Sequence, residues 1–117
     1  MNKLSATATT LRLLQTLADG LDRDAPMMQH LAFLHVALAG DGGMDQADLA
    51  DRLGASGAAT SRTVQALGQI HYHKDKPGFG LVDQQFDPTN HRKRRLTLTA
   101  KGRLIHARVL EALTDKK

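Results

Sequence analysis

The stretch MDQADLADRLGASGAATSRTVQAL, residues 44–67, decides the fold of this chain because it predicts two short helices joined by a tight turn. Asp45 is expected to cap the first helix, with Asp48 at the acidic position of a capping box. Gly54 stands where a helix ends on a left-handed residue. The first helix has one apolar face, made by residues at helical spacing: Leu49, Ala50 and Leu53.

The second helix is predicted to begin after Ser56, which can cap it, and to point Val64 and Leu67 inward. Its other face carries small or polar side chains at a spacing of three to four: Ala58, Ser61, Arg62, Gln65 and Gln69. A helix this slim fits the major groove of DNA, where Arg pairs with guanine and Gln with adenine. The alternative is an ordinary helical hairpin in an all-helical domain.

Composition points to one small domain with an aliphatic core. The 117 residues are 41% hydrophobic and 24% charged, but only 3% aromatic. The absence of cysteine excludes disulfides, thiol catalysis and cysteine-based zinc sites. The sequence has neither an 18-residue apolar run nor the apolar core of a signal peptide, so we expect a cytoplasmic protein without a membrane partner.

The positive charge lies in the second half of the chain. Residues 1–58 carry 4 Lys or Arg against 7 Asp, whereas residues 59–117 carry 12 basic against 5 acidic residues. The run HRKRR at 91–95 concentrates this charge and favours a polyanion as partner. The alternative interpretation is a solvated basic surface.

The segments around the helix pair complete a winged helix. Leucines at helical spacing predict a helix over 4–21, and apolar residues around most of its circumference predict a central core helix over 26–39. Alternation predicts strands over 79–86 and 93–98, joined through a turn cluster at 87–90, with a tip at Asn90-His91-Arg92. Thr99 is expected to cap a last helix over 100–113.

The predicted fold class is therefore mainly α with a small β-hairpin, a winged helix-turn-helix. Residues 1–117 form one domain in this interpretation. Its parts are a helix-turn-helix over 45–69, a wing over 79–98, and two terminal helices over 4–21 and 99–114. The terminal helices are more apolar than a domain of this size needs, so we expect them to pair two copies into a homodimer.

Two stretches resemble the MarR-type transcriptional regulators, which bind palindromic promoter DNA as winged homodimers. The helix pair contains QADLADRLG at 46–54, and the wing reads GLVDQQFDPTNHRKRRLTLTAKGR at 80–103. The likeness extends over residues 31–113. It implies a recognition helix over 56–69, with Arg92 as the wing side chain that enters the minor groove.

The chain departs from the family pattern at several positions. Asn90 and His91 replace the usual Asp-Arg pair, so the wing should lack its internal salt bridge. Thr60 replaces a branched apolar residue, which should soften the packing under the recognition helix. Residues 70–79 resemble an insertion, and little sequence follows Leu113, where the family has a longer helix.

The resemblance and the residue types together predict a double-stranded DNA interface on an inverted-repeat site. Arg62 and Gln65 would read bases, while Ser61 and Thr60 would meet phosphates or methyl groups. Lys93 and Arg95 would contact phosphates, whereas Arg94 shares the inward parity of Leu96 and would reach outward along the wing. The residues expected to face DNA are Ser56, Gly57, Ala58, Thr60, Ser61, Arg62, Gln65, His91, Arg92, Lys93, Arg94 and Arg95.

Other chemistries have weaker support. His71 and His73 could share one strand face, but no further ligands follow at metal-site spacing. The chain has a single Glu, Glu111, and no phosphate-binding loop or nucleophile motif, so we predict no enzyme, metal, cofactor or planar effector. The remaining alternative is a winged helix that docks on polymerase or another regulator as a protein-interaction module.

Overall fold

A computed structural model of the chain describes residues 2–68 and 77–114. The elements in chain order are α1 (Lys3–Gly20), α2 (Met27–Ala39), the short 3-10 helix η1 (Gly40–Gly42), β1 (Met44–Asp45), α3 (Gln46–Leu53), α4 (Gly57–Leu67), β2 (Val82–Asp87), β3 (Asn90–Leu98) and α5 (Ala100–Thr114). This mainly helical architecture with a small antiparallel sheet confirms the predicted fold class.

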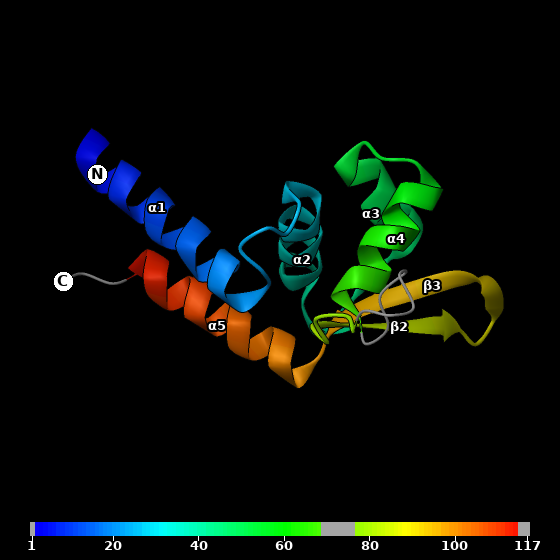
Figure 1. The fold of residues 1–117 in the computed structure, drawn as a ribbon. Coiled ribbons are helices and arrows are strands. Elements are labelled where there is room, and N and C mark those ends of the chain that lie inside the picture. Colours follow the sequence, from blue (N-terminus) through cyan, green and yellow to red (C-terminus); the bar gives the residue numbers. More distant parts are fainter. Residues whose placement is uncertain (1, 69–76, 115–117) are drawn as a thin grey trace.

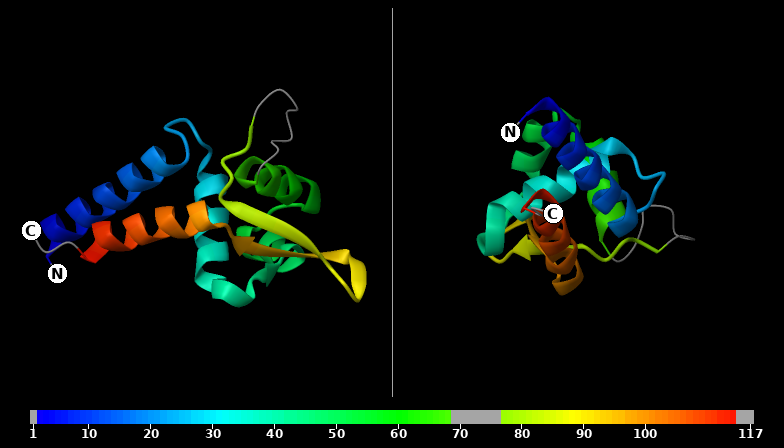
Figure 2. Two further views of the ribbon diagram at one scale, coloured as in Figure 1. Left: turned by 90° about the horizontal axis from the view of Figure 1, so that it is seen from below. Right: turned by 90° about the vertical axis from the view of Figure 1, so that its left-hand side faces the viewer.

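The molecule has two ends with different contents. The first and last helices, α1 and α5, run side by side in opposite directions (Figure 1). The helices α3 and α4 and the β2–β3 hairpin lie at the other end, with α2 between the two parts (Figure 2). The chain therefore separates its terminal helices from its helix-turn-helix.

The turn between α3 and α4 forms as the sequence predicts. Gly54 adopts the left-handed conformation with φ 64° and ψ 33°, and the N–H of Ala55 bonds the carbonyl of Ala50. The side chain of Ser56 accepts a hydrogen bond from the Ala59 N–H at 3.1 Å and caps α4. Both predicted end signals are thus confirmed.

The predicted cap by Asp45 is wrong. This residue occupies the N-cap position of α3, but its side chain makes no capping hydrogen bond. Its carboxylate lies 3.6 Å from a guanidinium nitrogen of Arg95 instead. The Asp45 carboxylate thus faces Arg95, 50 residues further along the chain, and not a backbone N–H at the start of α3.

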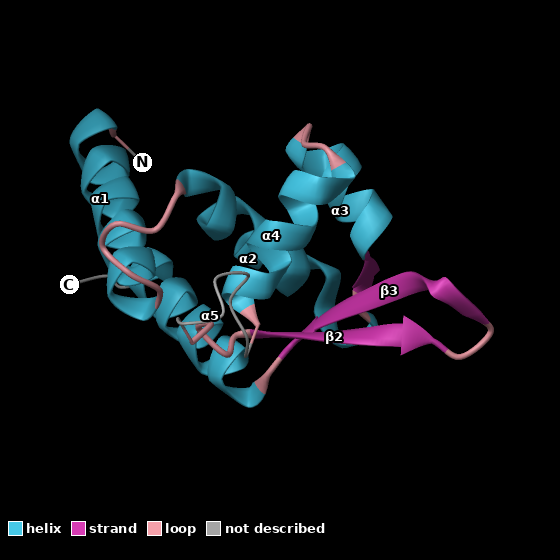
Figure 3. Ribbon diagram, turned by 45° about the vertical axis from the view of Figure 1, so that its right-hand side comes forward, coloured by secondary structure: helices cyan, strands magenta, loops and turns pink. Residues whose placement is uncertain are grey.

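The sheet has three strands in the order β1-β3-β2, all antiparallel, beside α3 and α4 (Figure 3). The β2–β3 hairpin was expected, whereas β1, which pairs Met44 with Leu96 and Asp45 with Arg95, was not. A two-residue strand is too short to produce a pattern of alternation, so the sequence carries no signal for it.

The tip of the hairpin lies earlier than predicted. Asp87 pairs with Asn90 across a turn, and its carboxylate accepts the N–H and the hydroxyl of Thr89 at 2.8 and 2.7 Å. Residues 90–92 consequently belong to β3. Because the next pair is Phe86 with Arg94, residues 91–93 form a bulge without cross-strand partners on β2.

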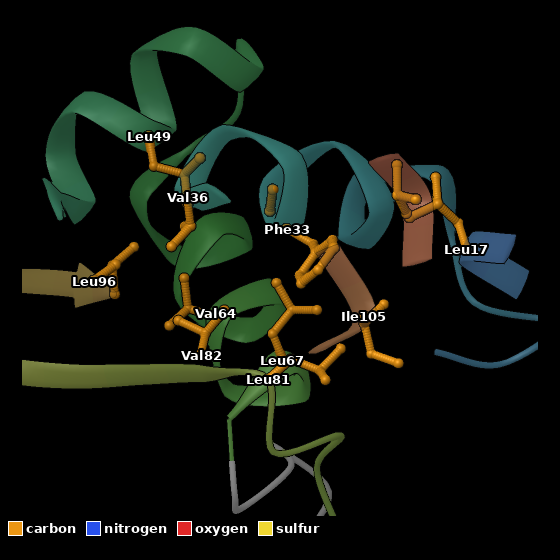
Figure 4. Close-up of a cluster of buried hydrophobic side chains, with 12 residues drawn as sticks. Leu17, Phe33, Val36, Leu49, Val64, Leu67, Leu81, Val82, Leu96 and Ile105 are labelled. Atoms are coloured by element: carbon orange, nitrogen blue, oxygen red, sulfur yellow. The ribbon is translucent and has the colours of Figure 1, made fainter. Parts of the chain in front are cut away.

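Helix α2 forms the centre of the core, as predicted. Its Phe33 and Val36 are fully buried, and the core around them is closed by Leu49 of α3, Leu67 of α4 and Leu96 of β3 (Figure 4). The core thus joins the sheet to both helices of the helix-turn-helix.

Helix α5 is joined closely to the base of the wing. The hydroxyl of Thr99 accepts the N–H of Gly102 at 3.0 Å and donates to the carbonyl of Gly80 at 2.7 Å. A β-carbon on Gly102 would lie 2.2 Å from the carbonyl oxygen of Leu81, so only glycine permits this approach. The predicted cap by Thr99 is confirmed.

The terminal helices pack through one side and leave other leucines exposed. Leu17, Ile105 and Val109 are buried between α1, α5 and the core. Six leucines of these helices are exposed, by 82% for Leu4, 55% for Leu11, 43% for Leu14, 52% for Leu104, 48% for Leu110 and 38% for Leu113. Within the described ranges, no helix combines the length and the apolar character needed to cross a membrane.

Candidate nucleic-acid interface

The outer face of α4 presents the predicted side chains to solvent. Ser56, Gly57, Ala58, Arg62 and Gln65 are exposed, and Ser61 is partly exposed. Across residues 2–68 and 77–114, Arg62 forms no ion pair with an acidic side chain. This helix therefore carries an available guanidinium and an available amide on one small-residue surface.

The predicted DNA contact by Thr60 is wrong. Its side chain is fully buried on the inner side of α4, and its hydroxyl has no hydrogen-bond partner in the described part of the chain. Thr60 precedes Val64 by four residues and Leu67 by seven, which places all three on one face of the helix. Thr60 is therefore a core residue.

The wing lies on the same side of the molecule as α4. A cleft of about 260 Å³ separates them, and its walls come from α3, α4 and β3. The residues that line it are Asp45, Gln46, Ala47, Ala50, Gly57, Thr60, Lys93 and Arg94. The start of the recognition helix and two cations of the wing therefore border one open space.

Arg94 lies against an aromatic ring of the wing. Its guanidinium carbon is 5.3 Å from the ring centroid of Phe86, its cross-strand partner. Phe86 is 59% exposed although it has the inward parity of Val82. The wing extends past the core at this point, so the face that is buried near Leu96 is open at Arg94. Arg94 was predicted to reach outward along the wing, and its guanidinium stacks there on the Phe86 ring.

Arg95 has partners within the protein. Its Nη1 donates to the carbonyl oxygen of Gly42 at 2.7 Å, and its Nη2 lies 3.6 Å from the Asp45 carboxylate. It lines a second cleft, of about 370 Å³, together with His35, Leu38, Ala39, Gly43, Met44, Asp45, Asp48 and Arg52. This cleft lies between α2, β1 and α3. Asp45 lines both clefts, whereas Arg95 lines only this one and Lys93 and Arg94 line only the other.

The side chains of His91 and Arg92 lie outside the described residues, as do Gln69, His71 and His73. The backbone of Arg92 belongs to the bulge of β3. Among the residues that the structure does place, no three His, Cys, Asp or Glu side chains gather as a metal site would require.

Within residues 2–68 and 77–114, the pKa values of Asp87 and His30 are shifted from their ordinary values. Hydrogen bonds from the side chain and the N–H of Thr89 lower the pKa of the exposed Asp87 carboxyl, with smaller contributions from Lys93 and Arg95. Burial lowers the pKa of His30 on α2, whose Nδ1 has no hydrogen-bond partner in the described ranges. Neither group has the surroundings of a catalytic acid or base.

The sequence did not predict one contact between the wing and α3. The side-chain amide of Gln84 on β2 donates to that of Gln46, the first residue of α3. No local pattern marks this pair because its members are 38 residues apart. Together with Arg95, it ties both strands of the hairpin to the start of the helix-turn-helix.

No protein-family model and no curated protein sequence matches the chain. Among solved structures, a MarR-like regulator of Thermotoga maritima is 26% identical with a TM-score of 0.61, over 96% of this chain and 75% of that one. A mutant of S. aureus MepR, bound to an oligodeoxyribonucleotide, is 17% identical with a TM-score of 0.67, over 93% and 70%. PcaV of Streptomyces coelicolor, in complex with its natural ligand, is 24% identical with a TM-score of 0.59, over 83% and 62%.

The chain spans between 62 and 75% of the length of these three regulators. The matches confirm at the level of fold the resemblance that the helix pair and the wing carry: the chain has the winged-helix fold of the MarR-type regulators. PcaV and the Thermotoga maritima protein are described as transcriptional regulators, the class of protein that the sequence predicts for this chain.

Proposed function

We propose that this chain, which has the fold of the MarR-type regulators, is a sequence-specific transcriptional regulator that binds double-stranded DNA as a homodimer in the cytoplasm. One observation carries the proposal: the N-terminal end of α4, at Gly57 and Thr60, and two cations of the wing, Lys93 and Arg94, border the same cleft. A duplex that receives α4 would therefore pass within reach of Lys93 and Arg94.

The dimensions of α4 suit the major groove. Its exposed residues between Ser56 and Ser61 are small, so the helix can approach the floor of a groove about 12 Å wide. Arg62 would pair with guanine O6 and N7, and Gln65 with adenine N6 and N7, each contact giving about 1–3 kcal/mol of discrimination. The N–H groups of Gly57 and Ala58 would donate to a phosphate oxygen at the start of the helix.

The wing would then follow the adjacent minor groove. Lys93 would contact phosphate on the cleft side, and Arg94 would do so while stacked on Phe86. We propose that Arg92, whose backbone lies in the bulge between these strands, enters the minor groove, where narrow A·T-rich tracts attract arginine.

The exposed leucines of α1 and α5 support a homodimer. Large apolar side chains left in water on neighbouring helices mark an interaction surface, and these helices extend away from the helix-turn-helix. A second copy packed there would place two recognition helices about one DNA turn, ~34 Å, apart and predict an inverted-repeat site.

The experiment is selection of bound duplexes from a random pool, followed by titration of the selected site with wild type and Arg62→Ala. We expect Arg62→Ala to weaken specific binding about tenfold or more and to change non-specific binding little. Arg23→Ala is the matched control, because Arg23 is an exposed arginine in the segment between α1 and α2, outside the helices proposed for DNA binding and dimerisation.

A selection that enriches no site would contradict the proposal. Equal affinity of wild type and Arg62→Ala for the selected site would contradict the role of α4. Retention of an acidic protein partner without any duplex binding would instead support the protein-interaction module.

A further inference from the structure

Arg95 joins strand β3 of the wing to the segment that precedes the helix-turn-helix. One of its guanidinium nitrogens donates to the Gly42 carbonyl at 2.7 Å, and another lies 3.6 Å from the Asp45 carboxylate. Arg95 and Asp45 are also direct partners in the β1–β3 ladder. A single side chain on the wing thus holds the turn and the strand that immediately precede α3.

The contact surface under this side chain is closely packed. Gly43 adopts φ +76°, and a β-carbon there would lie 2.5 Å from the carbonyl oxygen of Leu96 and 3.1 Å from the Cγ of Arg95. Only glycine allows the chain to pass so near to β3. The segment from Gly42 to Asp45 therefore contacts β3 through its backbone as well as through the ion pair between Asp45 and Arg95.

Arg95 lines a different cleft from its basic neighbours Lys93 and Arg94. Lys93 and Arg94 border the cleft beside α4, where a duplex would lie in the proposed function. Arg95 lines the other cleft, between α2 and α3, and its side chain is about half exposed there. Successive residues of a strand point to opposite faces, which accounts for the divergence of Arg94 and Arg95.

We propose that Arg95 is a positioning residue that sets the distance and angle between the wing and α4, through a clamp made of Arg95, Gly42 and Asp45. The inference rests on the proposed function and replaces the expected phosphate contact by Arg95. Asp45 ends β1 and directly precedes Gln46 of α3, so the clamp transmits the orientation of the wing to the helix-turn-helix in one residue.

The geometry of the guanidinium is essential to this role. Arginine can donate to the carbonyl while it faces the carboxylate, because its donors form a rigid fork. Lysine keeps the charge but has a single ammonium group on a flexible stem. A phosphate contact would tolerate Arg95→Lys, whereas a clamp would not.

The experiment measures binding to the selected duplex at several salt concentrations for Arg95→Lys, Arg95→Gln, Asp45→Asn and the Arg95→Gln/Asp45→Asn double variant. We expect Arg95→Lys and Arg95→Gln to weaken specific binding about tenfold, the factor that corresponds to one charge-assisted hydrogen bond. Asp45→Asn should weaken it less, because it removes only the ion pair and leaves the hydrogen bond to Gly42. The slope of log K against log salt should stay at the wild-type value, since no phosphate contact is lost.

Two controls make the result specific. Lys93→Gln should reduce the salt slope by about 0.9, the value for one phosphate contact. Arg103→Gln removes a 3.2 Å ion pair to Asp41 of the same turn from the α5 side, and it should leave the affinity unchanged. Thermal unfolding followed by circular dichroism shows whether each variant is folded.

The double variant and the groove footprints complete the test. The double variant should lose no more affinity than Arg95→Gln alone, because Arg95→Gln already removes both contacts of the guanidinium. Hydroxyl-radical protection in the minor groove should weaken in Arg95→Lys, while protection of guanine N7 in the major groove persists. A folded Arg95→Lys with wild-type affinity, or an Arg95→Gln that lowers the salt slope as Lys93→Gln does, would overturn the clamp. A wild-type chain that binds no duplex would overturn the proposed function itself.

Discussion

The substitution Thr60→Val should stabilise the fold without affecting DNA binding. Thr60 is fully buried beneath α4, and its hydroxyl has no partner in the described part of the chain. Other helical threonines of this chain satisfy theirs locally: the hydroxyls of Thr10 and Thr16 donate to carbonyls four residues earlier at 2.8 and 2.7 Å. Thr60 is an exception for which the described residues provide no compensating contact.

The magnitude follows from the cost of such a group. A buried hydroxyl without a hydrogen bond costs about 1–3 kcal/mol, and valine has the same shape with a methyl group in its place. We expect Thr60→Val to raise the free energy of unfolding by about 1–2 kcal/mol. For a domain near 100 residues, each kcal/mol shifts Tm by roughly 4–8 °C.

The assay is urea unfolding followed by far-ultraviolet circular dichroism, since the chain contains no tryptophan. The midpoint should rise at constant slope. Thr16→Val is the matched control: it removes a satisfied hydroxyl on α1 and should bring no gain. A Thr60→Val variant that is less stable than wild type would refute the reasoning about the hydroxyl. A tenfold loss of affinity for the selected duplex would show that Thr60 contacts DNA after all.

Three further predictions concern other parts of the fold. Because burial lowers the pKa of His30, this imidazole takes up its proton near the ordinary pKa of about 6.5 only in the unfolded chain, so the free energy of unfolding should fall as the pH drops through that region. His30→Leu should flatten this pH dependence in urea titrations between about pH 8 and 5. A pH profile that His30→Leu leaves unchanged would contradict the role of His30. Gly102→Ala should destabilise the fold by about 1–3 kcal/mol in the same assay, because its β-carbon would meet the carbonyl oxygen of Leu81; a neutral result would mean that α5 can shift. Leu11→Lys should shift sedimentation at tens of micromolar from dimer toward monomer, and a wild-type chain already monomeric there would contradict the proposed dimer.

Local signals predicted much of the fold from the sequence. Gly54 and Ser56 fix the turn between α3 and α4 through backbone conformation and a side-chain cap, which depend on few neighbours. The spacing of Val64 and Leu67 along α4 identified core side chains, whereas α2, which is apolar around most of its circumference, leaves Met27, Leu31 and Leu38 exposed. These features are written in consecutive residues, so a single sequence is enough to find them.

Features that depend on distant partners were missed or misplaced. Asp45 has the sequence of a helix cap, but Arg95 competes for its carboxylate across the sheet. Strand β1 exists because β3 offers it hydrogen-bonding groups, and its own two residues carry no pattern. The contact between Gln84 and Gln46 was missed as well, because these residues are 38 positions apart in the sequence.

Part of the candidate interface likewise follows from local sequence, and part depends on contacts between distant residues. The outer face of α4 follows from helical spacing, and that spacing also places Thr60 with Val64 on the inner face. The roles of the basic wing residues do not follow from composition, because Lys93, Arg94 and Arg95 are adjacent in sequence and yet meet different surroundings. Only the three-dimensional path of β3 distinguishes a cation that faces the α4 cleft from one that holds the wing.

The most direct measurement is a paired footprint of the wild-type chain on its selected duplex, with dimethyl sulfate for the major groove and hydroxyl radicals for the minor groove. If α4 and the wing bind the same duplex, guanine N7 atoms should be protected from dimethyl sulfate in each half-site. Minor-groove protection should then appear about half a turn, roughly 5 base pairs, away on one side, repeated in mirror image about the dyad. Major-groove protection without a neighbouring minor-groove signal, or a footprint without two-fold symmetry, would contradict the account.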